Sequence, residues 1–494
     1  MKIKDIEFGN ISSEVERLID QGVYITRVFQ DIFNIQDFLN KGKVLILGRK
    51  GTGKTFIKEY IDVEPRYNVF SCKISFKLKD LEVVIQEIGK LSDVREIDLW
   101  KWIFLCNLAE LMMKDKSLDI IHENSKACAA IESFLKTHRG YIEPNSFALK
   151  EQVTRYSTTI NMNFLKRAWM AVFKKDIAFK EERASFVKVI PYLEKMLIEI
   201  IQSSHSDRNK YFIFVDDIDD DYSGDEDQNK SIVDLINAAK DLFLRFGSEG
   251  VFFCPSILLR GDILSKLSYQ IDTRKLNEDL AFKIKWYDHQ TYRDNDSEVP
   301  LKNLMSKRIE YSYTKNGLTL LPKDLGQADY WDLLFIDWDD EKESFKYIAD
   351  NTLYRPRDFI TIFNIIKRQD GNSKSIKKSM VNKALGEYSQ KVIEEWKFEL
   401  KVFFKEFEIE SIIKYLSDIS GPFEGKSLLK LVPRLSDDVV NILYEYGLIC
   451  IYENERMFWK YREGFNDPAP EPHSTFLPHF CFKNASRKPK RFSF

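Results

Sequence analysis

The sequence predicts an α/β protein in which a mostly parallel sheet carries helices on both faces and is followed by further helical segments. Short apolar runs alternate with stretches of helical periodicity, a pattern typical of strands that are buried on both faces. The first of these runs, Val44–Leu47, leads directly into a glycine-rich turn. The net charge of -2, from 75 basic and 77 acidic residues, disfavours a protein coated for nucleic acid.

The length of 494 residues exceeds what one hydrophobic core usually occupies, so we expect several domains. Changes of pattern along the chain suggest an N-terminal linker over 1–40, a sheet-containing core over 41–295 with a helical insertion at about 85–205, a helical lid over 296–385, and a winged-helix-like domain with a basic tail over 386–494. The six scattered cysteines and the absence of a signal sequence or a long apolar stretch predict a cytoplasmic protein without a membrane span.

The expected strands and helices of the core follow from hydrophobic periodicity. The candidate strands are Val44–Leu47, Tyr67–Ser75, Tyr211–Val215, Val251–Leu259 and Ala281–Trp286. The candidate helices of the insertion are Leu99–Met113, Phe164–Phe173 and Phe186–Ile201. Tryptophans in this insertion could bind a partner, although tryptophans at helical spacing usually belong to a core.

The C-terminal region combines helices with a hairpin. Ser436 is a candidate N-cap of a helix that ends at Gly447. Two alternating runs follow, Leu448–Tyr452 and Met457–Tyr461, separated by four polar residues. Helices followed by a β-hairpin suggest a winged-helix module.

A phosphate-binding motif stands between the first strand and the helix expected over Phe56–Ile61. Its residues match G-x-x-x-x-G-K-[ST] in the strand–loop–helix context that this P-loop motif requires. Glycines permit positive φ, so that backbone N–H groups can surround a phosphate at a helix N-terminus. We expect the nucleotide to be bound by Gly48, Arg49, Lys50, Gly51, Thr52, Gly53, Lys54, Thr55 and Phe56.

Two side chains of this motif have expected chemical roles. Lys54 is predicted to be catalytic, bridging the β- and γ-phosphates, and the Thr55 hydroxyl is predicted to bind Mg²⁺. The apolar run that ends at Asp216 and Asp217 would deliver two carboxylates beside the loop. Asp216 is the predicted second Mg²⁺ ligand, and Asp217 the catalytic group that orients the attacking water.

The nature of the nucleotide follows from a missing motif. The sequence has no Asn-Lys-x-Asp for guanine recognition, because Asn229-Lys230 continues Ser-Ile, so ATP is preferred. The acidic run from Asp219 to Asp227 is interpreted as a solvated loop. A calcium loop starting at Asp219 would need a bidentate Glu where Lys230 stands.

Four motifs in order carry a resemblance to a known family: G-R-K-G-T-G-K-T, F-V-D-D-I-D, L-L-R-G-D-I-L and Y-R-P-R-D-F-I. The chain resembles a group of bacterial P-loop ATPases related to the AAA+ and STAND classes. The resemblance implies a P-loop core, a helical lid and a C-terminal winged-helix-like region. It covers nearly the whole chain, although only the phosphate motifs are individually specific.

The resemblance also implies sensor residues. Arg260, with Ser256 behind it, stands where relatives read the γ-phosphate, although a surface arginine at a strand end is an equal alternative. Arg357 matches the second sensor, and Pro356 the proline of the nucleotide-contacting Gly-x-Pro, while Tyr354 stands where that glycine is expected. Pro356 could also simply begin a helix. Two further arginines are candidates for action across a subunit boundary, Arg274 and Arg308.

These observations favour an ATPase that acts as a nucleotide-driven regulatory switch, with ATP and Mg²⁺ as cofactors. Relatives often serve in antiphage defence or stress signalling, so the resemblance implies a homo-oligomer and a protein effector. One alternative is a DNA-binding initiator- or loader-like ATPase, supported by five basic residues in Lys483–Phe494 but weakened by 16 basic and 16 acidic residues over 388–494. Another is a structural nucleotide site without significant turnover.

Overall fold

A computed structural model describes the chain as two compact units. The description covers residues 1–486 apart from 33, 65, 67, 76, 79–94, 121, 138–159, 162, 175–182, 185, 204–207, 221, 295–298, 319–328, 339–342, 434–437 and 463–467. The sheet unit contains Phe33–Arg49 and Lys54–Ile284, and the helical unit contains Met1–Ile32, Lys50–Gly53 and Lys285–Phe494.

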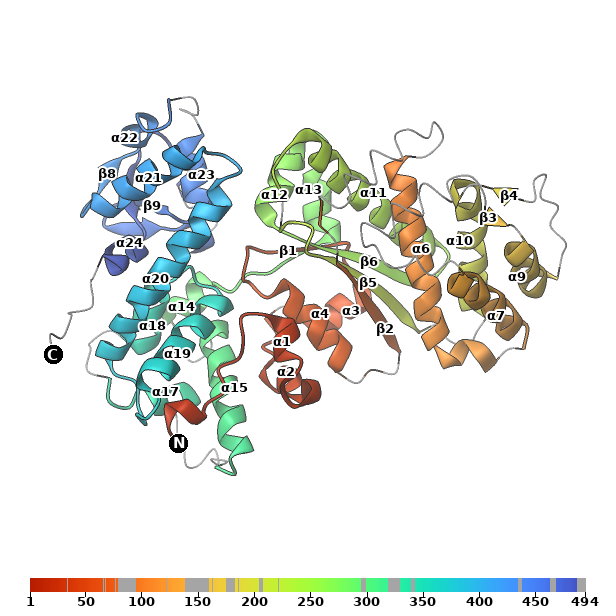
Figure 1. The fold of residues 1–494 in the computed structure, drawn as a ribbon, viewed down its shortest axis with the longest axis horizontal. Coiled ribbons are helices and arrows are strands. Elements are labelled where there is room, and N and C mark those ends of the chain that lie inside the picture. Colours follow the sequence, from red (N-terminus) through yellow and green to blue (C-terminus); the bar gives the residue numbers. More distant parts are fainter. Residues whose placement is uncertain are drawn as a thin grey trace. The chain divides into compact units, whose positions relative to one another are not determined.

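Within the described residues, the sheet unit is built on five parallel strands in the order β2-β5-β6-β1-β7 (Figure 1). The strands are β1 (Leu45–Leu47), β2 (Val69–Ser75), β5 (Lys210–Asp216), β6 (Phe252–Leu259) and β7 (Ala281–Lys283). Each overlaps one of the runs expected from the sequence. The mostly parallel α/β sheet is therefore confirmed, and the last strand is shorter than expected.

Helices cover both faces of this sheet because successive residues of its central strands are apolar and point alternately to the two faces. Tyr211 and Ile213 of β5 join the hydrophobic core formed with α6 (Glu96–Lys114), α10 (Phe186–Ser203) and α11 (Glu226–Ser248). Phe212 points the other way, and its ring lies 5.6 Å from that of Phe38 in α3 (Ile35–Lys41). A strand buried on both faces is the arrangement expected of a parallel sheet.

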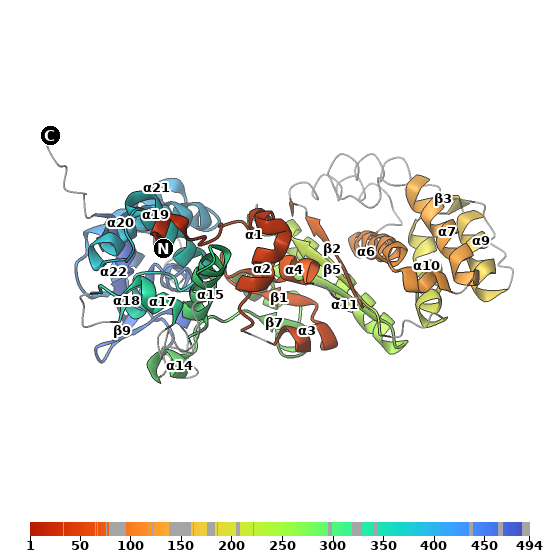
Figure 2. The same ribbon diagram turned by 90° about the horizontal axis from the view of Figure 1, so that it is seen from below.

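A helical insertion follows β2, as the sequence suggested. Its described elements beyond α6 form a separate group in both ribbon views (Figures 1 and 2). They are η3 (Lys116–Ile120), α7 (His122–Thr137), β3 (Ile160–Asn161), α9 (Asn163–Phe173), β4 (Arg183–Ala184) and α10. Trp100 and Trp102 of α6 are buried, so these two side chains belong to the core rather than to a partner surface.

The remaining elements of the sheet unit surround its loops. They are α4 (Lys54–Val63), α12 (Gly261–Lys266), η5 (Leu267–Tyr269), α13 (Thr273–Lys275) and η6 (Leu276–Leu280).

The N-terminal segment of the helical unit differs from the linker expected over 1–40. It contains η1 (Ile3–Asp5), α1 (Ser13–Glu16), η2 (Ile19–Gly22) and α2 (Val23–Val28). Ile3, Ile6 and Phe8 are fully buried, and the backbone N–H of Ile3 donates to the carbonyl of Ser373 over 2.9 Å. The segment is therefore packed into the unit, because it supplies apolar side chains that the following helices cover.

Helices dominate the rest of the helical unit. They are α14 (His289–Asp294), α15 (Pro300–Lys315), α17 (Tyr330–Leu334), α18 (Ser344–Asp350), α19 (Pro356–Asp370), α20 (Lys378–Leu400) and α21 (Glu406–Asp418). Figure 1 shows α20 running from the α17–α19 group to the C-terminal sheet of the same unit. This continuous helix crosses the boundary that the sequence placed between 385 and 386.

The C-terminal module holds a second sheet, antiparallel, in the order β10-β9-β11-β8. Its elements are β8 (Phe423–Glu424), α22 (Lys426–Leu429), α23 (Val439–Glu445), β9 (Ile449–Glu453), β10 (Arg456–Phe458), η9 (Lys460–Arg462), β11 (Thr475–Pro478) and α24 (Phe480–Ala485). The expected hairpin is confirmed, and its turn residues Asn454 and Glu455 have φ of 50° and 63°, typical of a type I′ turn.

Some expectations fall on parts of the chain outside this description. The candidate N-cap Ser436 and most of the basic tail lie outside the described residues. Among the residues that are described, no helix is both long and apolar enough to span a bilayer.

Candidate functional site

The topology of the sheet marks a ligand-binding edge. The chain leaves β1 through α4 toward the β2 edge, whereas it leaves the neighbouring β6 through α12 toward β7 at the opposite edge. Parallel crossovers are right-handed, so the two connections leave on opposite faces of the sheet. Ligands of open α/β sheets bind outside the carboxyl ends of the strands at such a point.

The glycine-rich loop begins at this edge. The backbone N–H of Gly48 still donates to the carbonyl of Leu259, over 3.3 Å, and α4 begins at Lys54. Gly51 and Gly53 have φ of 80° and 91°, a conformation that other residues rarely adopt. The predicted strand–loop–helix context is therefore present, and Phe56 is half-buried in the first turn of α4.

The loop belongs to both compact units. Lys50–Gly53 group with the helical unit, whereas Arg49 and Lys54 group with the sheet unit.

Lys54 closes back over the start of the loop. Its ammonium donates to the carbonyl of Gly48 over 3.1 Å and lies 4.0 Å from Asp219. The side chain of Asp219 is only 12% exposed, so it is not part of a solvated loop as the sequence suggested. The Asp219 carboxylate therefore lies next to the glycine-rich motif, near the Lys54 ammonium.

The two expected metal ligands meet at the end of β5. The Thr55 hydroxyl donates to Asp216 over 2.7 Å, and Asp216 is 4% exposed. Burial and the neighbouring charge of Asp217 raise the pKa of Asp216, while Lys73 and the Thr55 hydrogen bond oppose this increase. Asp217 is more exposed and has φ of 65°, which turns it away from the extended course of the strand.

Lys73 is a residue that sequence reasoning missed. Its ammonium lies 3.5 Å from Asp216 and 3.4 Å from Asp217. It comes from β2, which pairs in parallel with β5 and places Lys73 opposite Phe214. The available signal in the sequence was a lysine near the carboxyl end of the strand expected over Tyr67–Ser75.

Arg260 does not join this cluster. It precedes α12 and forms a two-pronged ion pair with Asp262, with nitrogen–oxygen distances of 3.1 and 2.6 Å. Ser256 is fully buried, and its hydroxyl donates to the carbonyl of Lys43 over 2.8 Å. In this structure Arg260 therefore fits the alternative of an arginine at a strand end better than that of a sensor.

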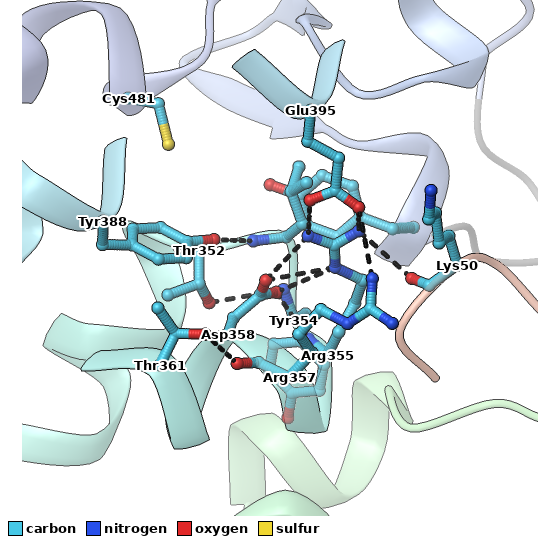
Figure 3. A network of polar contacts seen from close by, with 12 residues as sticks. Lys50, Thr352, Tyr354, Arg355, Arg357, Asp358, Thr361, Tyr388, Glu395 and Cys481 are labelled. Atoms are coloured by element: carbon cyan, nitrogen blue, oxygen red, sulfur yellow. Dashed lines mark hydrogen bonds and ion pairs between the residues drawn. The ribbon is translucent and has the colours of Figure 1, made fainter. Parts of the chain in front are cut away.

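Within the helical unit, the middle of the loop is held by the start of α19. Arg355 is buried and donates to the carbonyl of Lys50 over 3.1 Å (Figure 3). Its guanidinium also pairs with Asp358, at 2.8 Å, and with Glu395, at 3.1 Å. The attraction of these carboxylates outweighs burial and raises the pKa of Arg355 well above its usual value. The network was not expected from the sequence.

The turn before α19 is left-handed at Tyr354, whose φ is 57°. The resemblance expects glycine at this position, and a left-handed residue is what glycine supplies most readily. Pro356 occupies the first turn of α19, as expected of a helix start. Tyr354 therefore keeps the backbone conformation of the missing glycine.

Arg357 lies against the loop. Its backbone N–H donates to the carbonyl of Gly51 over 3.5 Å, and a Cβ added to Gly51 would come within 3.1 Å of the Arg357 side chain. The Trp286 indole also donates to the carbonyl of Thr52 over 2.9 Å, a contact that sequence reasoning missed. Gly51 is thus required both for its φ and for the close approach of Arg357.

The two arginines expected to act across a subunit boundary are placed differently. Arg308 is 2% exposed and pairs with Glu16 over 2.6 Å, and its guanidinium also donates a hydrogen bond to the Tyr24 hydroxyl over 2.8 Å. It supports the packing of the N-terminal segment, so the prediction of an intersubunit role is wrong for Arg308. Arg274 is exposed and pairs with Glu278, which leaves its expected role a prediction.

Comparison with known proteins identifies part of the helical unit. A family model described as the FunZ-associated C-terminal helical domain matches residues 300–397. The match runs from α15 into α20 and includes Arg355, Arg357 and Glu395, but it spans less than half of the chain and does not reach the glycine-rich loop. A search of curated proteins found no match.

Proposed function

We propose that the protein binds Mg·ATP on the Gly48–Thr55 loop and hydrolyses it as a P-loop ATPase of the AAA+/STAND type. The observation that carries this proposal is the meeting of Thr55 with Asp216, 2.7 Å apart, beside a loop whose glycines have positive φ. A hydroxyl and a buried carboxylate at a helix N-terminus suit a hard cation that accompanies a phosphate.

The residues present fit both cofactors. The loop exposes backbone N–H groups at the start of α4, where the helix dipole favours an anion. The Lys54 ammonium donates to the Gly48 carbonyl and lies 4.0 Å from Asp219, and it could turn from these contacts toward a phosphate. Thr55 and Asp216 would hold Mg²⁺, which when bound neutralises charge on the phosphate oxygens.

Asp217 is the proposed group that orients the attacking water. It follows Asp216, and its side chain is 37% exposed, so water can reach it. The Lys73 ammonium lies 3.4 Å away, and the Asp217 carboxylate would accept a proton from the attacking water. The proposed site thus contains residues for phosphate binding, for metal binding and for orienting the attacking water.

We further propose, from the resemblance and the lack of a second catalytic motif in the sequence, that hydrolysis drives a regulatory switch acting on a protein effector, within a homo-oligomer. Antiphage defence or stress signalling is the expected setting. The DNA-binding alternative gains little from the C-terminal module, because α23, Val439–Glu445, carries no lysine or arginine. A duplex-binding helix needs such side chains for phosphate contacts.

The test is ATP hydrolysis by the purified protein, compared with Lys54→Ala and Asp217→Asn. Lys41→Ala provides a matched control, because Lys41 is an exposed lysine of α3 that pairs with the exposed Asp37 one turn away. We expect Mg²⁺-dependent turnover that both site variants abolish and the control retains.

Three other outcomes would lead to different conclusions. Binding of ATP without turnover would make the nucleotide structural. Strong, salt-sensitive stimulation by double-stranded DNA would favour the loader-like alternative. No binding of ATP by the wild-type protein would refute the proposal altogether.

A further inference from the structure

Asp219 lies in the turn that follows β5 and faces the end of the glycine-rich loop, within the sheet unit. Asp217 has φ of 65°, and the backbone N–H of Asp220 donates to the carbonyl of Asp217 over 3.3 Å, so the chain turns back directly after the strand. This turn brings the Asp219 carboxylate to 4.0 Å from the Lys54 ammonium. The contact thus depends on the left-handed conformation at Asp217.

Asp219 and Lys54 form an ion pair that is nearly closed off from solvent. Their side chains are 12% and 11% exposed, respectively. Among the described residues, Asp219 accepts no hydrogen bond on its side chain and has no second cation within 4.0 Å. A nearly buried carboxylate is costly without a cation, so Asp219 depends on the charge of Lys54.

Lys54 is held more loosely than its burial suggests. Its ammonium donates to the carbonyl of Gly48 over 3.1 Å, whereas the separation from Asp219 is too long for a hydrogen bond and the attraction is electrostatic. Lys54 is also the first residue of α4, where the helix dipole favours an anion. A phosphate bound there and the Asp219 carboxylate are two anions that attract the same ammonium.

We propose that Asp219 is a positioning residue that competes with the nucleotide phosphates for Lys54 and thereby promotes release of the nucleotide. This inference rests on the proposed function and deepens it. Without nucleotide, Asp219 and the Gly48 carbonyl hold Lys54 at the start of the loop. When a nucleotide binds, Lys54 turns to its phosphates and leaves Asp219 nearly buried without a cation. This cost lowers the affinity for ATP and for ADP alike, because both carry the β-phosphate.

The turn that carries Asp219 is anchored on both sides, which explains why Lys54 is the side chain that moves. Ile218 is fully buried in the core of the sheet unit. Tyr222 is 8% exposed, and the ammonium of Lys266 in α12 lies 5.3 Å from the centre of its ring. Asp219 therefore stays in place, whereas the ammonium of Lys54 is carried on a flexible aliphatic stem.

The ion pair itself is tested first, in the nucleotide-free protein. Thermal unfolding is measured for wild type, Lys54→Ala, Asp219→Asn and the double variant. We expect Lys54→Ala to lower Tm by about 2 to 4 °C more in the wild-type background than in Asp219→Asn, because only the single variant leaves a nearly buried carboxylate without its cation. Additive effects would mean that the two side chains are not coupled, and the inference would fail.

The competition is tested by the dissociation constants and dissociation rates of ATP and ADP, with and without Mg²⁺, for the same four proteins. Asparagine has nearly the size of aspartate but lacks the charge that attracts Lys54. We expect Asp219→Asn to tighten both nucleotides about three- to tenfold, mainly through slower release, as expected for one ion pair at this separation. In the Lys54→Ala background the same change should have at most a small effect.

Asp220→Asn is the matched control, because it removes the same charge from the adjacent, exposed residue. It should leave both constants within about twofold of wild type, since exposed charges are screened by salt. An equal effect of Asp219→Asn and Asp220→Asn would show general repulsion of an anionic ligand and would overturn the competition. Asp219→Ala provides a second variant if asparagine prevents folding, and it should also tighten both nucleotides.

The remaining outcomes separate the two proposals. If wild type binds neither nucleotide, the proposed function fails and this inference fails with it, even where the Tm values show coupling. If wild type binds both but Asp219→Asn weakens them, Asp219 supports Lys54 in the bound state and the competition is wrong. Weakening that requires Mg²⁺ would assign Asp219 to the metal instead. Tightening that persists undiminished in Lys54→Ala would also overturn the inference, because Lys54 would then not be the contested side chain.

Discussion

The sheet unit and the helical unit each hold a charged cluster at the glycine-rich loop, and the two clusters differ in their charge balance. In the sheet unit two lysines face three carboxylates: Lys54 and Lys73, with Asp216, Asp217 and Asp219. In the helical unit three cations face three carboxylates: Lys50, Arg355 and Arg357, with Asp358, Glu395 and Glu399.

Each cluster contains one side chain whose charged form is disfavoured. In the sheet unit it is Asp216, whose pKa burial and Asp217 raise. In the helical unit it is Arg357, whose pKa burial and Arg355 lower. In both units the causes are burial and a neighbouring like charge.

The comparison is most sharply tested by removing the two arginines of the helical unit one at a time. Arg355→Ala leaves Asp358 and Glu395 as buried carboxylates without their main partner, which should lower the free energy of unfolding by about 3 to 5 kcal/mol. Arg357→Ala removes a side chain that is 30% exposed and lies 3.6 Å from Glu395, so it should cost less than about 1 kcal/mol.

Urea unfolding measures both values, and Arg355→Lys serves as the control. Lysine cannot reproduce the fork that pairs with Asp358, so it should restore little of the loss. Equal costs for the two alanine variants would mean that Arg357 is as firmly paired as Arg355, and the contrast between the two arginines would be wrong.

The sheet cluster was largely predictable from the sequence, whereas the helical network was not. Lys54, Thr55 and Asp216 lie in or directly after motifs whose spacing fixes their neighbours, because a strand, a tight loop and a helix follow one another without a gap. Lys73 escaped prediction because its partners depend on the parallel register of β2 and β5, which no local pattern specifies.

The helical network depends on contacts between residues that are far apart in the sequence. Arg355 meets Lys50 across 305 positions and Glu395 across 40. Glu395 itself looks like any glutamate on a polar helix face, because Glu394 precedes it and only the packing of Trp396 decides which of the two is buried. Arg308 was misjudged for the same reason, since its partner Glu16 lies 292 positions away.

The excess negative charge of the sheet cluster can be tested by neutralising Asp216, its central carboxylate. Asp216→Asn removes a metal ligand while keeping an acceptor for the Thr55 hydroxyl, so ATP hydrolysis should fall about 100-fold, equivalent to about 2.7 kcal/mol. Steady-state turnover at saturating Mg²⁺ measures the loss. Asp241→Asn is the control, because Asp241 is 46% exposed and pairs with Lys101 of α6; if it lost as much activity, the effect would not be specific to the site.

Lys73→Met changes the charge of the same cluster in the opposite sense, because it removes a cation instead of a carboxylate. Lys73 opposes the increase in the pKa of Asp216, so its removal raises that pKa further. Because Asp216 must be ionised to hold a metal, the acidic limb of the pH profile of hydrolysis should move to higher pH, with about tenfold lower activity on that limb. Activity should recover at alkaline pH. A uniform loss at every pH would indicate that Lys73 has a different role.

The smallest expected effect concerns the stability of the nucleotide-free protein. A buried carboxyl whose pKa is raised on folding contributes stability at low pH that is lost as the pH rises through the raised value. Asp216→Asn should therefore be more stable than wild type at neutral pH, by about 1 kcal/mol, or about 2 to 4 °C in Tm for a unit of this size. Lowering the pH through the raised pKa protonates Asp216 and should close the gap, as thermal unfolding at several pH values would measure. A variant that is less stable than wild type at neutral pH would mean that Lys73 and Thr55 already compensate the charge of Asp216, so that the sheet cluster does not lack a cation. The effect of Asp216 on the stability of the nucleotide-free protein and its role in ATP hydrolysis would then have different physical causes.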